Sequence, residues 1–488
     1  MKAKLLTLAT ALLLSAANVA VAEINLWPVP EGEPVSAFWS VDINGRRADA
    51  LTARTADPPF DHYDYGGEYA FLSVDADEPL EFTIREETGA NLDNLVIRPQ
   101  SLGLKPTMND DGTFSIAVDK PCQFSVEYDG RLHPLLIFVN PLETDVPNEG
   151  DDNVIYFGPG LHKADKIAVG DNQTLYLAPG AVVQGGIYVN GKNVKIRGRG
   201  VLDSNPWKWR EGPTGHTVHV ANSQDVSIEG IIIRGSSRWT VVPVNSDNVV
   251  IDNIKICGGR AQNDDGINPC NSRNVHVSNT FIRSDDDCIA LKGLEVDYGN
   301  CEDISAVNCV FWCDRARIVL MGHESRAPYM RRVLFKNCDV IHSQTRNFLL
   351  EPGEKMRMED ITFEDIRFET GKENALSPEA LEKMKSIDTS TLRFDVDVVN
   401  KDNWLFVGRP VVNVYMRTKE PGYIKNVVIR NVSVTGPASY CGILFSGADE
   451  EHRTDGLTIE NFVLFGKKQT SDSPLIHIGD FIDNVEVK

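Results

Sequence analysis

Basic residues are scarce in this chain of 488 residues. It holds 49 Lys and Arg against 70 Asp and Glu, which gives a formal charge of −21 at neutral pH. A chain this acidic is a poor nucleic-acid binder, because that binding needs clusters of positive charge to neutralise phosphates. We therefore expect no nucleic-acid partner, although a local basic patch could still hold an acidic ligand.

Long apolar runs are absent beyond the first 22 residues. The chain begins MKAKLLTLATALLLSAANVAVA, in which two lysines precede an apolar stretch and small residues stand before Glu23. This pattern is typical of a cleaved signal peptide, and no later segment approaches the ~18–20 apolar residues of a spanning helix. We expect residues 1–22 to be a signal peptide and the protein to be secreted or periplasmic. No Cys follows the cut, and no membrane insertion is expected.

The sequence also lacks a CxxC pair with a histidine at matching spacing, which argues against a zinc site. Seven of its nine cysteines lie between Cys257 and Cys338, within or beside β-like segments. We interpret them as small buried apolar residues on neighbouring strands, with one or two disulfides as the alternative. No metal and no other cofactor are expected.

Short alternating runs such as LEFTIRE and TFSIAVD fill residues 24–140, separated by Gly, Pro and Asp. Strands of this length with turn residues at this spacing predict an antiparallel β-sandwich. We assign residues 23–142 to this sandwich. The polar stretch 143–152 is the expected linker out of it.

A repeat begins after the linker. Copies include NVKIRGRGVL from Asn193, NVVIDNIKICG from Asn248, NVHVSNTFIRS from Asn274 and NVVIRNVSVTG from Asn426. Each copy has alternating apolar residues, then Asn, Gly or Asp where a sharp bend needs a left-handed backbone. Such short strands bury an apolar row only when coils stack in parallel.

The repeat predicts a right-handed parallel β-helix over residues 153–488, so the fold class is all-β. A leucine-rich repeat is the rival, but its fixed leucine and asparagine spacing is missing. The segment SPEALEKMKSI from Ser377 begins like a capped helix. We expect it to belong to an insertion at about residues 372–418.

Carboxylates gather on two adjacent coils. The segment QNDDGINPC contains Asp265, and SDDDCIALKG contains Asp286 and Asp287, which lie 21 and 22 residues later. This offset is close to one coil, so the two segments are expected to lie side by side. Paired carboxylates on a rigid face can hydrolyse a glycosidic bond, with one as proton donor and another activating water. Solvated corner residues and a calcium site are the alternatives.

These motifs resemble glycoside hydrolase family 28, the polygalacturonases. NDDGIN at Asn263–Asn268 is similar to the family's Asn-Thr-Asp-Gly segment, and DDC at Asp286–Cys288 is similar to its Asp-Asp-Cys segment at the same offset. SSRW ending at Trp239 resembles its Ser-Pro-x-Trp stretch, and Gly322 with His323 resembles Gly-His-Gly, with Glu324 replacing the second Gly. The resemblance covers most of residues 153–488. The sandwich in front resembles bacterial relatives and the family 49 dextranases of the same clan.

The resemblance implies roles for individual residues. Asp286 would be the general acid, Asp265 and Asp287 would activate water, and the anomeric carbon would be inverted. His323 would hydrogen-bond a catalytic carboxylate or the sugar. Asp264 and Asp285 are expected to be solvated neighbours.

Substrate binding departs from the family pattern. Where polygalacturonases have an Arg-Ile-Lys segment, this chain has Leu349, Leu350 and Glu351, and Glu351 would repel a uronate if it pointed into the cleft. Arg315 and Arg326 join other basic residues as candidates for a displaced pocket, and Trp207 and Trp209 are candidates for an aromatic platform. The predicted substrate-binding residues are Lys292, Arg317, Arg346, Trp239, Trp209 and Glu324.

The sequence therefore predicts a secreted, inverting glycoside hydrolase that acts on a polysaccharide or oligosaccharide, with a pectic, galacturonan-type glycan as the leading substrate. A hydrolase of a neutral α-glucan is the second hypothesis. A calcium-dependent β-helix lyase and a non-catalytic glycan-binding solenoid are the rivals from other classes. We expect a monomer.

Overall fold

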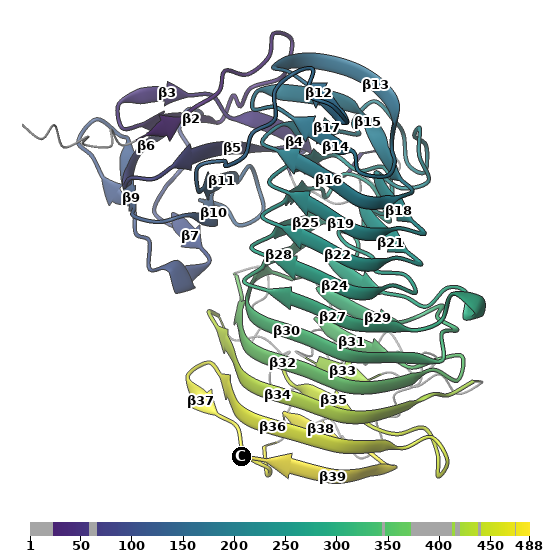
Figure 1. Ribbon diagram of the computed structural model, residues 1–488. Coiled ribbons are helices and arrows are strands. Elements are labelled where there is room, and N and C mark those ends of the chain that lie inside the picture. The colour runs from purple at the N-terminus through teal and green to yellow at the C-terminus, as the bar shows by residue number, and fades with distance from the viewer. Residues whose placement is uncertain are drawn as a thin grey trace, which may run out of the picture.

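Nearly all regular structure in the protein is β-strand (Figure 1). The structure is a computed structural model that describes residues 23–57, 66–343, 347–371, 412–414, 420–437, 441–473 and 475–488. Within these ranges the helical segments are two 3-10 turns, η1 (Gln100–Leu102) and η2 (Val296–Tyr298). No helix in the described part of the chain is long and apolar enough to cross a membrane. The expected signal peptide and the helix from Ser377 lie outside the described residues.

The N-terminal part consists of two small sheets. Their strands are β1 (Ile24–Asn25), β2 (Trp39–Ile43), β3 (Arg46–Ala48), β4 (Leu51–Arg54), β5 (Glu68–Ala76), β6 (Leu80–Glu86), β7 (Val96–Arg98), β8 (Thr107–Met108), β9 (Phe114–Val118), β10 (Cys122–Glu127) and β11 (Leu135–Asn140). One sheet has the order β1-β5-β11-β10-β7 with β4 beside β5, and the other has the order β3-β2-β6-β9-β8. The pairs are antiparallel except β5 with β11, which is parallel. The sequence-based expectation of a purely antiparallel sandwich missed this pair.

The rest of the chain is a right-handed parallel β-helix with three faces, as the repeat predicted. The first face carries β15 (Ala181–Val189), β18 (Val218–Ala221), β21 (Val241–Val244), β26 (Ile289–Leu291), β29 (Val319–Gly322), β31 (Phe348–Glu351), β33 (Val412–Val414), β35 (Ile443–Phe445) and β38 (Ile476–Ile478). The second face carries β12 (Val154–Phe157), β14 (Thr174–Leu177), β16 (Lys192–Gly198), β19 (Gln224–Glu229), β22 (Asp247–Asp252), β24 (Arg273–Ser278), β27 (Cys301–Val307) and β39 (Ile482–Val487). The third face carries β17 (Val201–Asp203), β20 (Ile232–Arg234), β23 (Lys255–Cys257), β25 (Phe281–Ser284) and β28 (Val310–Cys313). Strand β13 (Gly160–Val169) pairs with β15 along its length, and these two long strands run from the third face onto the first.

Later coils run without a break from the second face to the third. These long strands are β30 (Tyr329–His342), β32 (Arg357–Glu369), β34 (Tyr423–Thr435) and β36 (Thr454–Leu464), and β37 (Lys467–Lys468) folds back antiparallel on β36. Strand β33 pairs with β31 and β35, so the range 372–418 that the sequence assigned to an insertion contains a strand of the first face. The domain boundaries at 142 and 152 stay a prediction.

Asparagines form ladders along the corners of the coils. Asn274 has a left-handed φ of 52°, and its side chain donates to Asp247 on the preceding coil at 2.7 Å. Asn337 and Asn308 have φ values of 52° and 58° and are joined by a 2.7 Å hydrogen bond. An amide side chain tolerates this backbone and satisfies polar groups at the same time, which explains why Asn recurs there.

The interior of the coils is a continuous apolar core. Phe348 and Phe363 stack with ring centroids 4.5 Å apart, and Phe335 lies 5.7 Å from Phe363. The seven cysteines from Cys257 to Cys338 are buried free thiols, so no disulfide joins these seven.

The sandwich packs against the third face of the N-terminal coils (Figure 1). Phe138 of β11 meets Phe281 of β25 at a centroid distance of 5.4 Å. Buried ion pairs cross this interface, including Arg199 with Asp75 at 2.8 Å. The site described next is built on the first face.

Candidate active site

Strand register brings distant residues into one row on the first face. The successive register partners on this face are Val218, Val241, Ile267, Ile289 and Val319. Two positions before them stand, in order along the helix axis, His216, Trp239, Asp265, Asp287 and Arg317. Backbone hydrogen bonds between neighbours, such as Gly266 N–H to the Asp287 carbonyl at 2.8 Å, hold this spacing. We call these five residues the cavity row.

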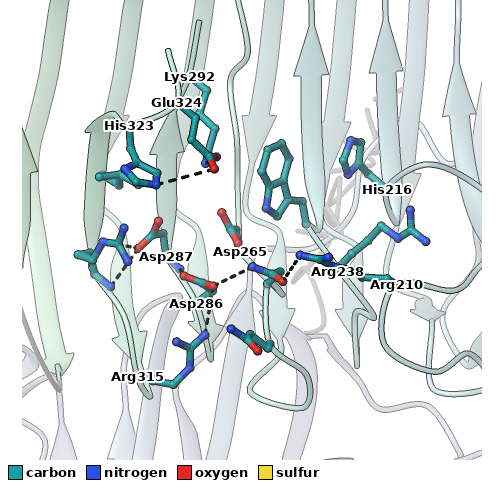
Figure 2. Close-up of a pocket in the computed structure, with 15 residues that line it drawn as sticks. Arg210, His216, Arg238, Asp265, Asp286, Asp287, Lys292, Arg315, His323 and Glu324 are labelled. Carbon is teal, nitrogen blue, oxygen red and sulfur yellow. Dashed lines mark hydrogen bonds and ion pairs between the residues drawn. The ribbon is translucent and has the colours of Figure 1, made fainter. Parts of the chain in front are cut away.

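A cavity of about 510 Å³ opens on the cavity row (Figure 2). It is lined by Arg210, His216, Arg238, Trp239, Gln262, Asn263, Asp265, Asp286, Asp287, Lys292, Arg315, Arg317, Leu320, His323 and Glu324. The structure thus brings together all four predicted catalytic residues with Lys292, Arg317, Trp239 and Glu324. Their side-by-side placement follows from the one-coil offset read in the sequence.

Asp265 and Asp287 are the most deeply enclosed acids of the cavity lining. Asp265 is 2% exposed, and its Oδ2 accepts a 2.7 Å hydrogen bond from the Asn268 side chain. No hydrogen-bond partner for its Oδ1 occurs among the described residues. Burial, and then the charges of Asp286 and Asp287, raise the pKa of Asp265 well above its usual range.

Asp287 lies one coil further along the row and meets Arg317. Its Oδ1 lies 3.2 Å from Arg317 Nε and accepts the Arg317 backbone N–H at 3.1 Å. Burial raises the pKa of Asp287 to about 6 in spite of the neighbouring guanidinium. A carboxylate of that basicity is a better base near neutral pH than an exposed aspartate.

Asp286 points into the cavity between two donors. Its Oδ2 accepts from Arg315 Nη2 at 3.1 Å and from the Asn263 side chain at 3.3 Å, and its Oδ1 accepts the Asp287 backbone N–H at 3.1 Å. The carboxyl group is therefore fixed in orientation and open to a ligand. This is the geometry that a proton donor or nucleophile needs.

Asp264 and Asp285 are buried, so the expectation that they are solvated neighbours was wrong. Asp264 accepts four backbone N–H bonds, from Gly259 and Arg260 on its own turn and from Asp285 and Asp286 on the next coil, at 2.7–3.2 Å. Asp285 accepts from Arg315 Nε at 2.8 Å. Both side chains hold the loop that presents Asp286, a role that sequence spacing alone does not reveal.

His323 bonds a different carboxylate from the expected one. Its Nδ1 lies 2.9 Å from both oxygens of Glu351, while its Nε2 lies 3.9 Å from Glu324. Glu351 is buried in this pair at the end of β31, so it does not point freely at a substrate. Repulsion of a uronate was predicted only if Glu351 pointed into the cleft. His323, and not Glu351, lines the cavity.

Lys292 and Trp239 form a second contact in the cavity. Lys292 Nζ lies 4.6 Å from the centre of the Trp239 ring and 3.6 Å from Glu324 Oε2. Glu324 is largely exposed, with 61% of its side chain accessible. A cation over an aromatic face whose carboxylate partner is largely exposed can exchange that partner for the anionic group of a ligand.

Other predicted binders lie elsewhere. Trp209 does not line the cavity, although its neighbour Arg210 does and lies over the Trp209 ring at 4.5 Å. Arg326 pairs with Glu354 at 3.0 Å away from the cavity lining. Arg346 lies outside the described residues.

Sequence reasoning missed four polar residues of the lining: Arg210, His216, Arg238 and Gln262. His216 stacks on Trp239 with an interplanar angle of 9° and centroids 5.3 Å apart. Burial lowers the pKa of His216 to about 3, so it is a neutral ring. Counting back one coil from Trp239 would have found His216, because the register is uniform there.

Comparison with known proteins agrees with this geometry. Residues 183–312 match the family model described as glycosyl hydrolases family 28. A probable exopolygalacturonase B of Aspergillus terreus is 28% identical over 244 residues, covering 44% of this chain and 53% of the relative. A probable polygalacturonase of Vitis vinifera is 32% identical over 120 residues, covering 23% of this chain and 24% of the relative. The chain thus matches about half the length of these relatives or less.

Among solved structures, Dex49A from Penicillium minioluteum aligns with a TM-score of 0.61 at 15% identity, covering 93% of this chain and 95% of that one. At this identity the likeness shows a shared fold. The family match covers the coils that carry Asp265, Asp286 and Asp287. Over residues 183–312 the chain is thus similar to the glycosyl hydrolases of family 28, in agreement with the resemblance of the motifs.

Proposed function

We propose that the protein is an exported glycoside hydrolase that cleaves an acidic, pectic glycan by inverting acid and base hydrolysis. The observation that carries this proposal is the cavity row, in which Asp265, Asp287 and the adjoining Asp286 share one cavity with several cations. Glycosidic hydrolysis needs a carboxyl group that keeps a proton beside one that activates water. Export rests on the sequence of residues 1–22.

Charge repulsion explains how the cluster keeps that proton. Three carboxyl groups in one buried site titrate as a set, and burial raises the pKa of Asp265 and Asp287. The set therefore holds a proton at a pH where isolated aspartates would have lost theirs. We assign the proton donor to Asp286, which is open to the cavity, and water activation to Asp265 with Asp287.

Two further contacts support an acidic substrate. Arg317 and Lys292 line the same cavity as the carboxylates, and each is paired with a single acid, Asp287 and Glu324 respectively. Arg315 holds Asp285 and Asp286 and is already engaged. Several relatives are named exopolygalacturonases, so we expect units to be released from a chain end.

A substrate screen tests the activity. Polygalacturonate, rhamnogalacturonan, dextran, pullulan and marine galactans would each be incubated with the protein, with and without EDTA, and the products separated. We expect short uronate products from polygalacturonate, unaffected by EDTA, with the inverted anomer first in the NMR spectrum. Unsaturated products that EDTA abolishes would identify a lyase, and cleavage of dextran alone would identify a neutral-glucan hydrolase.

The variant Asp286→Asn tests the assigned acid. The amide keeps the shape of the side chain but cannot donate a proton, so we expect reducing-end release to fall by at least ~100-fold. Folding, checked by circular dichroism, and glycan binding, checked by calorimetry, are expected to survive. Unchanged turnover would refute the role of Asp286.

A further inference from the structure

Two arginines on the His216 side of the cavity stand apart from the others. Arg238 directly precedes Trp239, and its Nη1 donates to the Gly215 carbonyl at 3.0 Å. Arg210 lies in the loop after β17, and its Nη2 donates to the Asn263 side chain at 3.0 Å. Both donate to neutral oxygens, Arg210 also lies over the Trp209 ring, and Figure 2 shows the two side chains next to each other at the cavity edge.

The remaining cations of the cavity all have acidic partners. Arg315 pairs with Asp285 and Asp286, Arg317 with Asp287, and Lys292 with Glu324. In the described part of the chain, neither Arg210 nor Arg238 has a carboxylate within 4.0 Å. Among the described residues, no carboxylate therefore compensates the positive charge at this edge of the cavity.

Holding these cations together costs free energy. Arg238 is half-buried, and its Nε is enclosed with no hydrogen-bond partner among the described residues. Burial, and then repulsion from Arg210, lower the pKa of Arg238. Like charges are tolerated at a cavity when a ligand supplies the opposite charge, and guanidinium groups bind carboxylate or sulfate oxygens in pairs.

The backbone supports the same arrangement. The Arg210 N–H donates to the Ser237 carbonyl at 2.8 Å, which ties the Arg210 loop to the residue before Arg238. Arg210 itself has a left-handed φ of 61°, a conformation that costs free energy for a side chain of this kind. Beside the pair, the stacked rings of His216 and Trp239 offer a neutral surface for a sugar face.

We propose that Arg210 and Arg238 bind the anionic group of a sugar unit that lies on the His216 side of the acidic cluster. The group is a carboxylate or a sulfate ester. This inference rests on the proposed function, because it places a second acidic unit of the same glycan chain. The anionic group would thus bind on the coils before Asp265. The Arg-Ile-Lys segment of the polygalacturonases corresponds instead to residues on the coils after Asp265.

The test compares Arg210→Gln, Arg238→Gln and the double variant with the wild type. The substrates are polygalacturonate, its fully methyl-esterified form and a sulfated galactan. We expect kcat/KM on polygalacturonate to fall about 10- to 100-fold in the double variant, mainly through KM. Turnover of the esterified form is expected to change less than threefold. Arg326→Gln, an exposed arginine paired with Glu354 outside the cavity lining, is the matched control and is expected to leave both unchanged.

Equal losses on charged and esterified substrate would overturn the proposal, as would no loss on either. A loss confined to the sulfated galactan would identify a sulfate ester as the bound group, and a loss confined to polygalacturonate would identify a carboxylate. Calorimetry of trigalacturonate on Asp286→Asn, with and without the two Arg→Gln changes, separates this inference from the proposed function. If the wild type cleaves no uronate but the double change abolishes this binding, the anion site stands while the hydrolytic assignment falls.

Discussion

Buried charged residues have different kinds of partners on the two sides of the N-terminal coils. At the sandwich interface on the third face, buried arginines meet carboxylates directly, as in Arg199 with Asp75 and Arg234 with Glu33 and Asp203 at 2.7–3.0 Å. In the cavity on the first face, Asp265 keeps an oxygen without a partner in the described part of the chain. Arg210 and Arg238 likewise have no carboxylate partner among the described residues and donate to neutral oxygens.

The difference teaches how to separate structural charge from functional charge in this fold. A buried ion pair whose two members bond each other fixes how two parts of the protein dock. Removing one member leaves the other charge buried without a partner, which lowers the stability of the fold. A buried charge without a partner lowers stability and persists where a ligand completes it. Substitutions on the two faces are therefore expected to affect opposite properties.

The largest expected effect is on activity, in Asp265→Asn. We expect kcat to fall by ~10²–10⁴-fold, because the amide cannot take part in activating water. The free energy of unfolding is expected to stay the same or rise, since the change removes repulsion with Asp286 and Asp287. Reducing-end assays and urea unfolding measure the two quantities. Retained activity, or a large loss of stability, would contradict the assignment of Asp265 to function rather than to stability.

Arg199→Met at the interface is expected to do the reverse. Asp75 would be left buried without its guanidinium, which typically costs about 3–5 kcal/mol of stability. Activity below the unfolding transition is expected to match the wild type, because Arg199 lies outside the cavity lining. The double variant Arg199→Met with Asp75→Leu is expected to recover part of the loss. Urea unfolding of the three proteins checks this, and an equal stability of wild type and single variant would contradict it.

The smallest expected effect concerns pH. The pKa of Asp287 is about 6 in the folded protein, so Asp287 binds more proton there than in the unfolded chain. Its contribution to the free energy of unfolding is full below about pH 4 and is lost as pH rises through about 6, by about 3 kcal/mol. Asp287→Asn should remove this slope, whereas Asp110→Asn on the sandwich surface should not. Parallel pH profiles for wild type and Asp287→Asn would argue against a raised pKa of Asp287.

The sequence predicted the solenoid and the meeting of Asp265 with Asp287 because both depend on a period that the backbone enforces. The corner asparagines and alternating apolar residues repeat with that period, so their positions can be counted. The contacts of His323 with Glu351 and of Asp264 with four backbone N–H groups could not be predicted in this way. They depend on the shapes of the turns between strands, where segment lengths vary from coil to coil.

The ladder of corner asparagines has a consequence for how such a protein can change. Each rung, such as Asn274 with Asp247, joins one coil to the coil before it, so a duplicated or deleted whole coil leaves the ladder closed. A one-residue deletion inside a coil breaks the rungs on both sides and turns the apolar row outward. The groove can therefore lengthen or shorten only in whole-coil steps of ~4.8 Å, and the length of glycan it accommodates changes by the same increments.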